Sequence, residues 1–200
     1  MSSDRQEYGD PETRRRILKV CLDLVAERGS RMRLVDVAEK AGVSRQALYL
    51  HFGDRTGLLL ALVKYMDKTL ELDARLAHVH AAPDATELLK RAMRLNARFW
   101  TLVLPVAQVL EAAQYTDEAL GAAWRNRLAY RQKTFAAMIE QLAGQGDLSP
   151  DWSIRDASAL LYGVAHFDTW RELTQRVGWS EDKYVTAMTR LLCRSLLHRV

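Results

Sequence analysis

The 200-residue chain has little cysteine, glycine or proline and no long apolar run. Its two cysteines, Cys21 and Cys193, lie in apolar helical patterns, which predicts small buried side chains and no disulfide framework or metal knuckle. Ten glycines and four prolines are too few for the frequent turns of a many-stranded sandwich or barrel. No segment approaches the ~18 consecutive apolar residues of a spanning helix, and no apolar core of a signal peptide is present. We therefore expect a cytoplasmic protein with no membrane partner and no all-β fold.

Charge is distributed unevenly along the chain. The net charge is only +4, and 48% apolar with 27% charged residues is typical of a globular protein. Residues 14–55, however, contain ten basic and five acidic side chains, so that segment alone carries ten minus five, or +5. A local excess of this size indicates an anionic partner for the N-terminal segment.

Apolar residues recur at helical spacing along the chain, and no strand pattern or internal repeat is present. This periodicity predicts an all-α fold of about nine helices. Glycine, proline and capping residues place them at about 12–28, 34–41, 44–52, 54–82, 84–105, 106–115, 116–144, 154–175 and 181–198.

Residues 34–52, LVDVAEKAGVSRQALYLHF, have the pattern of a helix-turn-helix. Two short helices joined by a turn with Gly42 would pack through their apolar residues and direct the second helix toward a DNA major groove. Arg45, Gln46 and Tyr49 then lie on the outward face of that second helix. Donors of this kind suit nucleic acid, although amphipathic hairpins with a basic face also occur in proteins that never bind DNA.

The motifs around this turn resemble those of the TetR family of transcriptional repressors. The chain has AGVS at 41–44, LYLHF at 48–52 and a basic residue, Arg55, just inside the next helix. The polar residues 1–11, with Gly9 and Pro11, predict a flexible tail. The resemblance covers about residues 14–63 and implies a DNA-binding domain at 12–56 and a ligand-binding and dimerisation domain at 57–200. It also implies a homodimeric repressor of a near-palindromic double-stranded DNA operator, released by a small-molecule effector, with no catalytic role and no cofactor.

Side-chain chemistry divides the expected DNA contacts into two groups. Arg45 can pair with guanine and Gln46 with adenine, whereas Ala47 offers only a methyl contact to thymine. Phosphate contacts are expected from residues with outward donors: Arg33, Ser44, Tyr49, His51 and Arg55. For three of them a purely structural role is the alternative to DNA contact. Ser44 would then serve only as a helix cap, His51 would only pack against its neighbours, and Tyr49 would lie partly in the core.

One position departs from the family pattern. A hydroxyl residue usually begins the first helix of the turn motif, where it caps the helix and contacts phosphate, but this chain has Arg33 there. An arginine can bind phosphate but cannot accept a capping bond from a backbone N–H. We therefore expect that helix to begin without a side-chain cap.

The C-terminal helices offer candidates for a ligand pocket and a dimer interface. Polar and aromatic residues on apolar stripes are the pocket candidates, with plain core packing as the alternative for each: Asn96, Phe99, Trp100, Gln108, Tyr115, Trp124, Tyr162, His166 and Trp170. The expected dimer contacts are Leu161, Val164, Met188, Leu192 and Leu196, against the alternative of a wholly intramolecular core. His78 and His80 face different ways on a helix and are not expected to bind metal.

The effector is expected to be largely apolar, because the predicted inward stripes hold no cation that could offset a buried anion. A cationic aromatic compound is the alternative if Glu111 and Asp168 turn inward. Two other functions compete with the repressor. One is an all-α enzyme that uses His166 with Glu111 or Asp168, and the other is an interaction module that has lost DNA binding. The sequence specifies neither the operator nor whether binding represses or activates.

Overall fold

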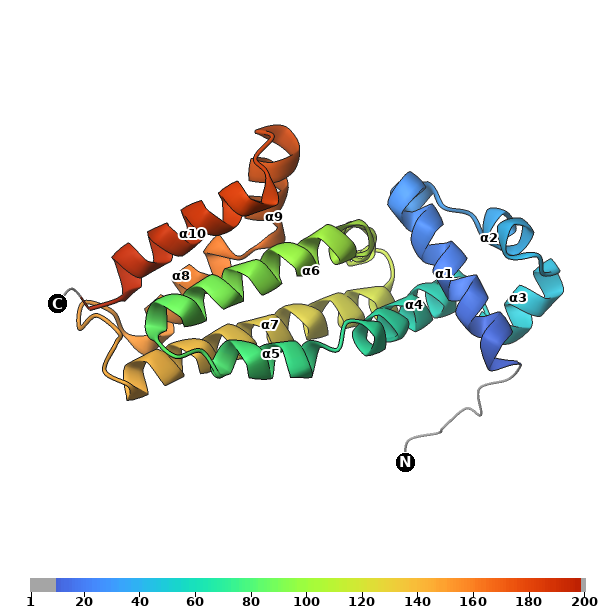
Figure 1. The fold of residues 1–200 in the computed structure, drawn as a ribbon. Coiled ribbons are helices and arrows are strands. Elements are labelled where there is room, and N and C mark those ends of the chain that lie inside the picture. The colour runs from blue at the N-terminus through green and yellow to red at the C-terminus, as the bar shows by residue number, and fades with distance from the viewer. Residues whose placement is uncertain (1–9, 199–200) are drawn as a thin grey trace, which may run out of the picture. The chain divides into compact units, whose positions relative to one another are not determined.

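The computed structural model describes residues 10–198, and every regular element in that range is helical (Figure 1). The predicted all-α class is confirmed. The predicted tail at 1–11 lies almost wholly outside the described residues. A 3₁₀ turn at Gly29–Arg31 and a π turn at Glu172–Arg176 accompany ten α-helices: α1 (Pro11–Arg28), α2 (Leu34–Ala41), α3 (Arg45–Phe52), α4 (Arg55–Thr69), α5 (Leu72–His80), α6 (Ala85–Ala113), α7 (Glu118–Gly144), α8 (Ile154–Val164), α9 (Phe167–Arg171) and α10 (Glu181–Leu196).

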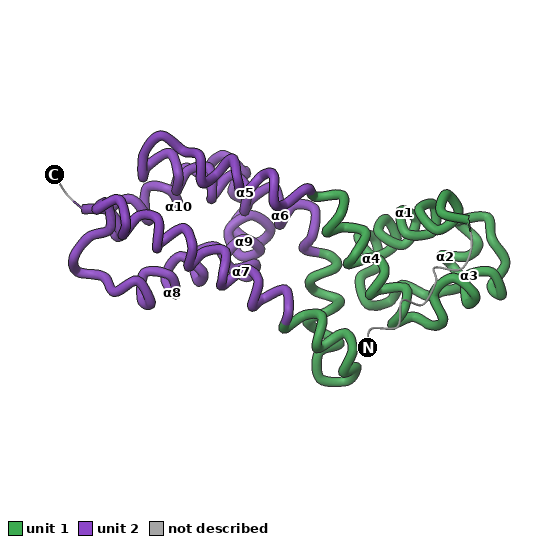
Figure 2. Tube along the Cα trace, turned by 90° about the horizontal axis from the view of Figure 1, so that it is seen from below, with its two compact units in different colours: residues 1–70, 105–125 green, residues 71–104, 126–200 purple. Residues whose placement is uncertain are grey.

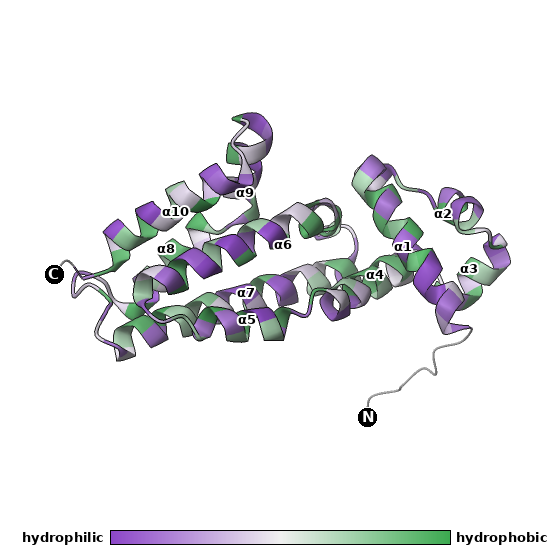
Figure 3. Ribbon diagram, viewed as in Figure 1, coloured by the Kyte–Doolittle hydropathy of each residue, from purple (hydrophilic) through white to green (hydrophobic). Residues whose placement is uncertain are grey.

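Helix starts follow the capping residues in the sequence. Ser44, Asp54 and Ser180 cap α3, α4 and α10 by accepting backbone N–H bonds, as their positions predict. Figure 3 shows hydrophilic and hydrophobic segments on the same helices, which is the amphipathic pattern of helices packed around a core. Within residues 10–198, no helix combines the length and the apolar character needed to cross a membrane.

The chain forms two compact units (Figure 2). The first contains the chain up to Leu70 together with Pro105–Arg125. In it, α1 packs against α2 and α4, and α2 packs against α3. Its core is formed by aliphatic side chains of these helices: Ile17, Cys21, Leu24, Val37, Leu48, Leu58 and Leu62. The functional boundary at residue 56 remains a prediction.

The second unit contains Glu71–Leu104 and the chain from Asn126 onward. Side-chain bonds connect its helices: the indole Nε1 of Trp100 on α6 donates to the Ala165 carbonyl oxygen (2.9 Å), and Asn96 Nδ2 donates to the Tyr184 hydroxyl on α10 (3.2 Å). Its core includes large side chains from five helices: Leu89, Met93, Trp100, Ile139, Leu161, Phe167 and Tyr184.

Three predicted helix boundaries are wrong. The helix expected at 54–82 is divided by Glu71, which has a left-handed backbone (φ 45°) between α4 and α5. The two helices expected at 84–105 and 106–115 are one helix, α6 (Ala85–Ala113). It continues through Pro105, beside which Leu104, Val106 and Ala107 are buried. The helix expected at 154–175 breaks after Ala165, whose carbonyl accepts bonds from Trp100 and Arg131 side chains.

Candidate nucleic-acid interface and ligand cavity

The first turn of α3 presents the residues predicted to contact bases. Arg45 and Gln46 are exposed there, and Ala47 is partly exposed. Ser44 Oγ accepts a bond from the Ala47 backbone N–H (3.0 Å), which fixes the start of the helix. The exposed groups therefore lie at the N-terminal end of the helix, where the aligned backbone dipoles favour an anion.

The turn between α2 and α3 depends on Gly42. Its backbone is left-handed (φ 65°, ψ 38°), and its N–H bonds to the carbonyls of Ala38 and Glu39 at the end of α2. Glycine adopts this conformation without the steric cost that a Cβ would add. The sequence prediction of a glycine-based helix-turn-helix is confirmed.

The predicted phosphate contacts differ in their local environment. Tyr49 is 51% exposed, which argues against its alternative role in the core. Ser44 is a helix cap, but its hydroxyl proton remains able to donate to a phosphate. His51 is partly buried, with its ring centroid 5.9 Å from that of Phe52, and among the described residues its buried Nδ1 has no hydrogen-bond partner. The partial burial of His51 therefore favours a packing role for it. Tyr49 and Ser44 are more exposed and have side-chain donors that can reach a phosphate.

Arg33 and Arg55 already have bonds within the first unit. Arg33 is the N-cap residue of α2 and makes no capping bond, as predicted. Its guanidinium, 71% exposed, donates to the Asp36 carboxylate at 2.7 Å and lowers the pKa of that carboxyl. Arg55 Nη2 donates to the Ser30 carbonyl oxygen (3.1 Å). A guanidinium has five N–H donors, so either side chain can bind a phosphate with the donors that these bonds leave over.

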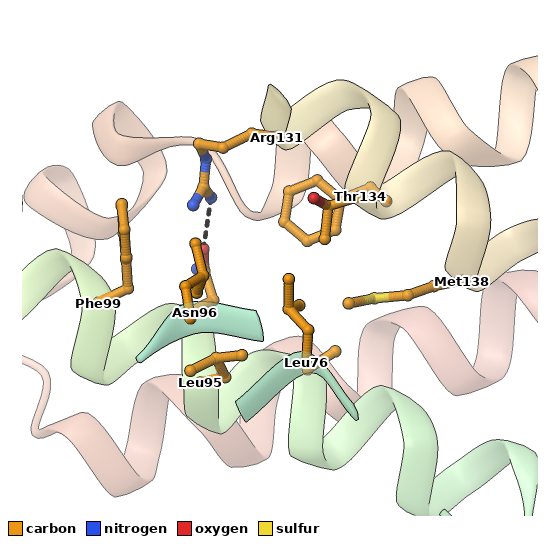
Figure 4. Close-up of a pocket in the computed structure, with 10 residues that line it drawn as sticks. Leu76, Leu95, Asn96, Phe99, Arg131, Thr134 and Met138 are labelled. Atoms are coloured by element: carbon orange, nitrogen blue, oxygen red, sulfur yellow. Dashed lines mark hydrogen bonds between the residues drawn. The ribbon is translucent and has the colours of Figure 1, made fainter. Parts of the chain in front are cut away.

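A cavity of about 30 Å³ lies in the second unit between α5, α6 and α7 (Figure 4). Most of its wall is apolar: Leu72, Leu76, Ala92, Leu95, Phe99, Phe135 and Met138. Asn96, Arg131 and Thr134 add polar groups to it. This combination of an apolar wall with a few polar groups is typical of small-molecule sites, although known sites are larger, at about 300–1,000 Å³.

Two of the polar groups form one network. Asn96 is buried, and its side-chain oxygen accepts a bond from Arg131 Nη2 at 2.7 Å while its amide nitrogen donates to Tyr184. Both ends of the buried Asn96 amide therefore have hydrogen-bond partners. Arg131, in contrast, is missed by sequence reasoning, because it lies in a polar run of α7. Its spacing of four and seven residues before Phe135 and Met138 is the pattern that places it on their face.

The expectation of an interior without a cation is therefore wrong. The other acid–base candidates do not line the cavity: Glu111 belongs to the first unit, and Asp168 is paired with Arg171 in the second. In residues 10–198, no three His, Cys, Asp or Glu side chains gather in a way that could hold a metal ion.

Only two of the predicted ligand residues, Asn96 and Phe99, line this cavity. Four others pack elsewhere in the second unit: Trp100, Tyr162, His166 and Trp170. Gln108, Tyr115 and Trp124 belong to the first unit. Tyr115 is 89% exposed, so its prediction as part of an apolar wall is wrong.

A second depression, a surface groove of about 460 Å³, lies along α5 and α6. Its charged lining comes mainly from arginines, which are partly exposed or exposed: Arg75, Arg91, Arg94 and Arg98. Arg91 is held by Glu87 and by the His78 carbonyl oxygen.

Four of the five predicted dimer residues are in the core of the single chain. Leu161, Met188, Leu192 and Leu196 are buried, so their side chains have little surface to offer a partner, whereas Val164 is partly exposed. The error arises because periodicity identifies an apolar face but not what covers it. The outward positions of the same helices include Ala159 and Gly163 on α8 and Leu191, 45% exposed, on α10.

The fold and the exposed α3 surface define a helix-turn-helix DNA-binding protein with a second helical unit that contains a cavity. Residues 17–62 match the family of bacterial regulatory proteins known as the tetR family. This segment therefore has the DNA-binding domain of TetR-family transcriptional regulators. A comparison with curated proteins found no match.

Solved structures share the fold over nearly the whole chain. A protein from Rhodococcus sp. assigned to the TetR family is 27% identical, covers 92% of this chain and 97% of its own, and has a TM-score of 0.64. A regulator from Saccharomonospora viridis in complex with choline is 23% identical (95% and 100% covered, TM-score 0.78). FadR from Bacillus subtilis, in complex with stearoyl-CoA, is 15% identical (89% and 96% covered, TM-score 0.71).

Proposed function

We propose that the protein is a cytoplasmic repressor that binds a near-palindromic operator as a homodimer and is released by a small, mostly apolar effector. The observation that carries the DNA-binding part is the exposure of Arg45 and Gln46 at the first turn of α3, next to the Ser44 cap. In a major groove, this position brings an arginine fork and an amide to the base edges.

The homodimer supplies two copies of α3 for one operator. Half-sites would then lie about one DNA turn, ~34 Å, apart, which requires a near-palindromic sequence. We assign the dimer contact to the outward positions of α8 and α10. Ala159 is exposed there, and a Cβ built on Gly163 meets no atom within 4 Å, so a partner helix can approach closely.

The cavity of the second unit is the proposed effector site. Its small volume means that an effector must displace lining side chains. The relatives from Saccharomonospora viridis and Bacillus subtilis carry choline and stearoyl-CoA, respectively, which supports a small-molecule effector without naming its class. An effector releases DNA by binding more tightly to a dimer conformation whose α3 helices no longer match the operator spacing.

Selection of bound DNA from a pool of random duplexes tests this function. We expect enrichment of a near-palindrome with half-sites about one turn apart. Recovery of no palindromic sequence by a folded dimer would contradict DNA recognition and favour the interaction-module alternative.

Two arginine variants then test the division of roles on the selected operator. Arg45→Ala removes a base contact, so we expect a loss of ~1–3 kcal/mol in binding and relaxed preference at one base pair per half-site. Arg55→Ala removes a phosphate contact, so it should weaken all sequences alike and lower the salt slope by about one per subunit. If Arg55→Ala changed base preference and Arg45→Ala did not, the assignment would be reversed.

A further inference from the structure

The cavity of the second unit has a cation surrounded by aromatic rings. The guanidinium carbon of Arg131 lies 4.4 Å from the ring centroid of Trp100, 5.0 Å from that of Phe99 and 5.2 Å from that of Phe135. Rings at these distances stabilise a cation through their faces, but they do not neutralise its charge.

The bonds of this guanidinium leave part of its donor capacity unused. Nη2 donates to Asn96 Oδ1 (2.7 Å) and to the Ala165 carbonyl oxygen (3.1 Å). In residues 10–198, neither Nε nor Nη1 of Arg131 donates to a protein acceptor, and no carboxylate forms an ion pair with it. Arg131 is partly exposed, so these two groups are accessible to a ligand, and an anion is the ligand that complements their charge.

Arg131 stays charged at neutral pH. Burial lowers its pKa to about 10, while the nearby Tyr162 and Tyr184 oppose that shift. The remaining lining is almost entirely apolar, and the Thr134 hydroxyl is already bonded to the Tyr130 carbonyl oxygen (2.9 Å). The site therefore combines one cationic fork with an apolar wall (Figure 4).

We propose that the effector is a monocarboxylic acid with a compact apolar body, whose carboxylate accepts bonds from Nε and Nη1 of Arg131. This inference rests on the proposed effector function of the cavity. The apolar body would occupy the space between α5 and α7 by moving Leu76 and Met138, because the cavity as it stands holds only about 30 Å³. A carboxylate suits the planar fork of an arginine in a bidentate pair.

Other ligand charges fit less well. A cationic compound would meet the like charge of Arg131 over the ring faces that Arg131 already occupies. A phosphate monoester would bring a second negative charge that no other cation lining the cavity can offset. A polyphosphorylated amphiphile could instead place its head in the arginine groove, because Leu95 lines both the groove and the cavity.

Four probes that share a phenyl ring separate these possibilities on the full-length protein. They differ in charge and are phenylacetate, phenylacetamide, phenethylamine and phenyl phosphate. Binding is measured by calorimetry and by tryptophan fluorescence, with octanoate added as an aliphatic acid. We expect both acids to bind at least about tenfold more tightly than the amide, because a charge-assisted fork adds to the apolar contact.

Variants assign the effect to Arg131. Arg131→Met removes a charge with no counter-ion but also the bond to the buried Asn96, so its fold is checked by circular dichroism. The folded variant should lose at least about tenfold in acid affinity with no change for the amide. Arg131→Lys keeps the charge without the fork, so it should bind acids less tightly than wild type yet still prefer them to the amide. Arg98→Met, an exposed arginine of the groove, is the matched control and should bind as wild type.

The outcomes are distinct from those that test DNA binding. Three results would overturn the proposal. The acid and the amide could bind with equal affinity, the folded Arg131→Met variant could bind acids as wild type does, or neither acid could bind at millimolar concentration. Binding of stearoyl-CoA that is lost in Arg98→Met but kept in Arg131→Met would overturn it in favour of the groove. Operator selection by the ligand-free protein is scored separately, so a failure there counts against the proposed function and not against this ligand class.

Discussion

The Phe52 carbonyl oxygen at the end of α3 leaves no space for a side chain at Gly57 on α4. A Cβ at position 57 would lie 2.0 Å from that oxygen and 3.2 Å from the carbonyl carbon. Both are backbone atoms, so no side-chain rotation can relieve the overlap. The close approach of these two helices therefore requires glycine and fixes how α3 is supported.

We predict that Gly57→Ala destabilises the first unit by ~1–3 kcal/mol, the usual cost of overpacking, and weakens operator binding. Gly144→Ala is the control, because Gly144 ends α7 with no atom within 4 Å of a built Cβ. Urea unfolding of both variants measures the effect. Equal stability of the two alanine variants would contradict the close approach.

The start of α2 gives a second prediction. Arg33 makes no capping bond, and its partner Asp36 keeps a second ion pair with Arg28 at 2.8 Å. We expect Arg33→Ser to raise the free energy of unfolding by about 0.5 kcal/mol, because a capping bond gains more than the exposed ion pair contributes. The same variant should weaken DNA binding if Arg33 contacts phosphate.

Ser44→Ala provides the reference for this cap, since it removes the bond to Ala47 N–H and should cost ~1 kcal/mol. Urea unfolding and operator binding at two salt concentrations are the measurements. A less stable Arg33→Ser with unchanged DNA affinity would refute both halves of the prediction.

The sequence predicts the DNA-binding part of this fold better than the ligand-binding part, for physical reasons. Gly42, Ser44 and the LYLHF motif act within one or two helical turns, so local rules identify the helix-turn-helix. Arg131 becomes part of a cavity only when α6 and α7 pack together, and periodicity along one helix does not say which polar residue turns inward. Leu161 and Leu192 show the same limit, because their apolar stripes predict burial but not the surface that covers them.

His166 gives a prediction about acid stability. Burial is the largest influence on its pKa and lowers it below 6.5, although Asp168 opposes the shift. The unfolded chain then binds more protons than the folded one as the pH falls through 6.5, so His166 contributes stability at pH 7.5 that is lost toward pH 5. We expect His166→Gln to lose less stability than wild type over this interval in urea unfolding. A parallel pH dependence of the two proteins would count against a depressed pKa.

Glu71 stores backbone strain between α4 and α5. It is the only non-glycine residue with positive φ among residues 10–198, and a left-handed backbone costs a residue with a Cβ about 1–2 kcal/mol. We expect Glu71→Gly to raise the free energy of unfolding by about 0.5 kcal/mol, because the relief exceeds the added entropy of the unfolded chain. Ala74→Gly, in the helix that follows, should lower it by about 1 kcal/mol. Chemical unfolding in which both variants lose stability would argue against strain at Glu71.

Neighbouring leucines on α10 test the dimer surface. Leu191 is 45% exposed, whereas Leu192 is fully buried in the second unit. If the outward side of α10 contacts a partner, Leu191→Glu should dissociate the dimer and leave each chain folded, because in the free chain the carboxylate remains in water. Leu192→Glu should unfold the chain, since it places an unpaired carboxylate in the core at a cost of several kcal/mol.

Sedimentation at micromolar concentration gives the oligomeric state, and circular dichroism gives the fold. A Leu191→Glu protein that remained a dimer would exclude this position from the interface, and a wild-type monomer would remove the proposed homodimer altogether.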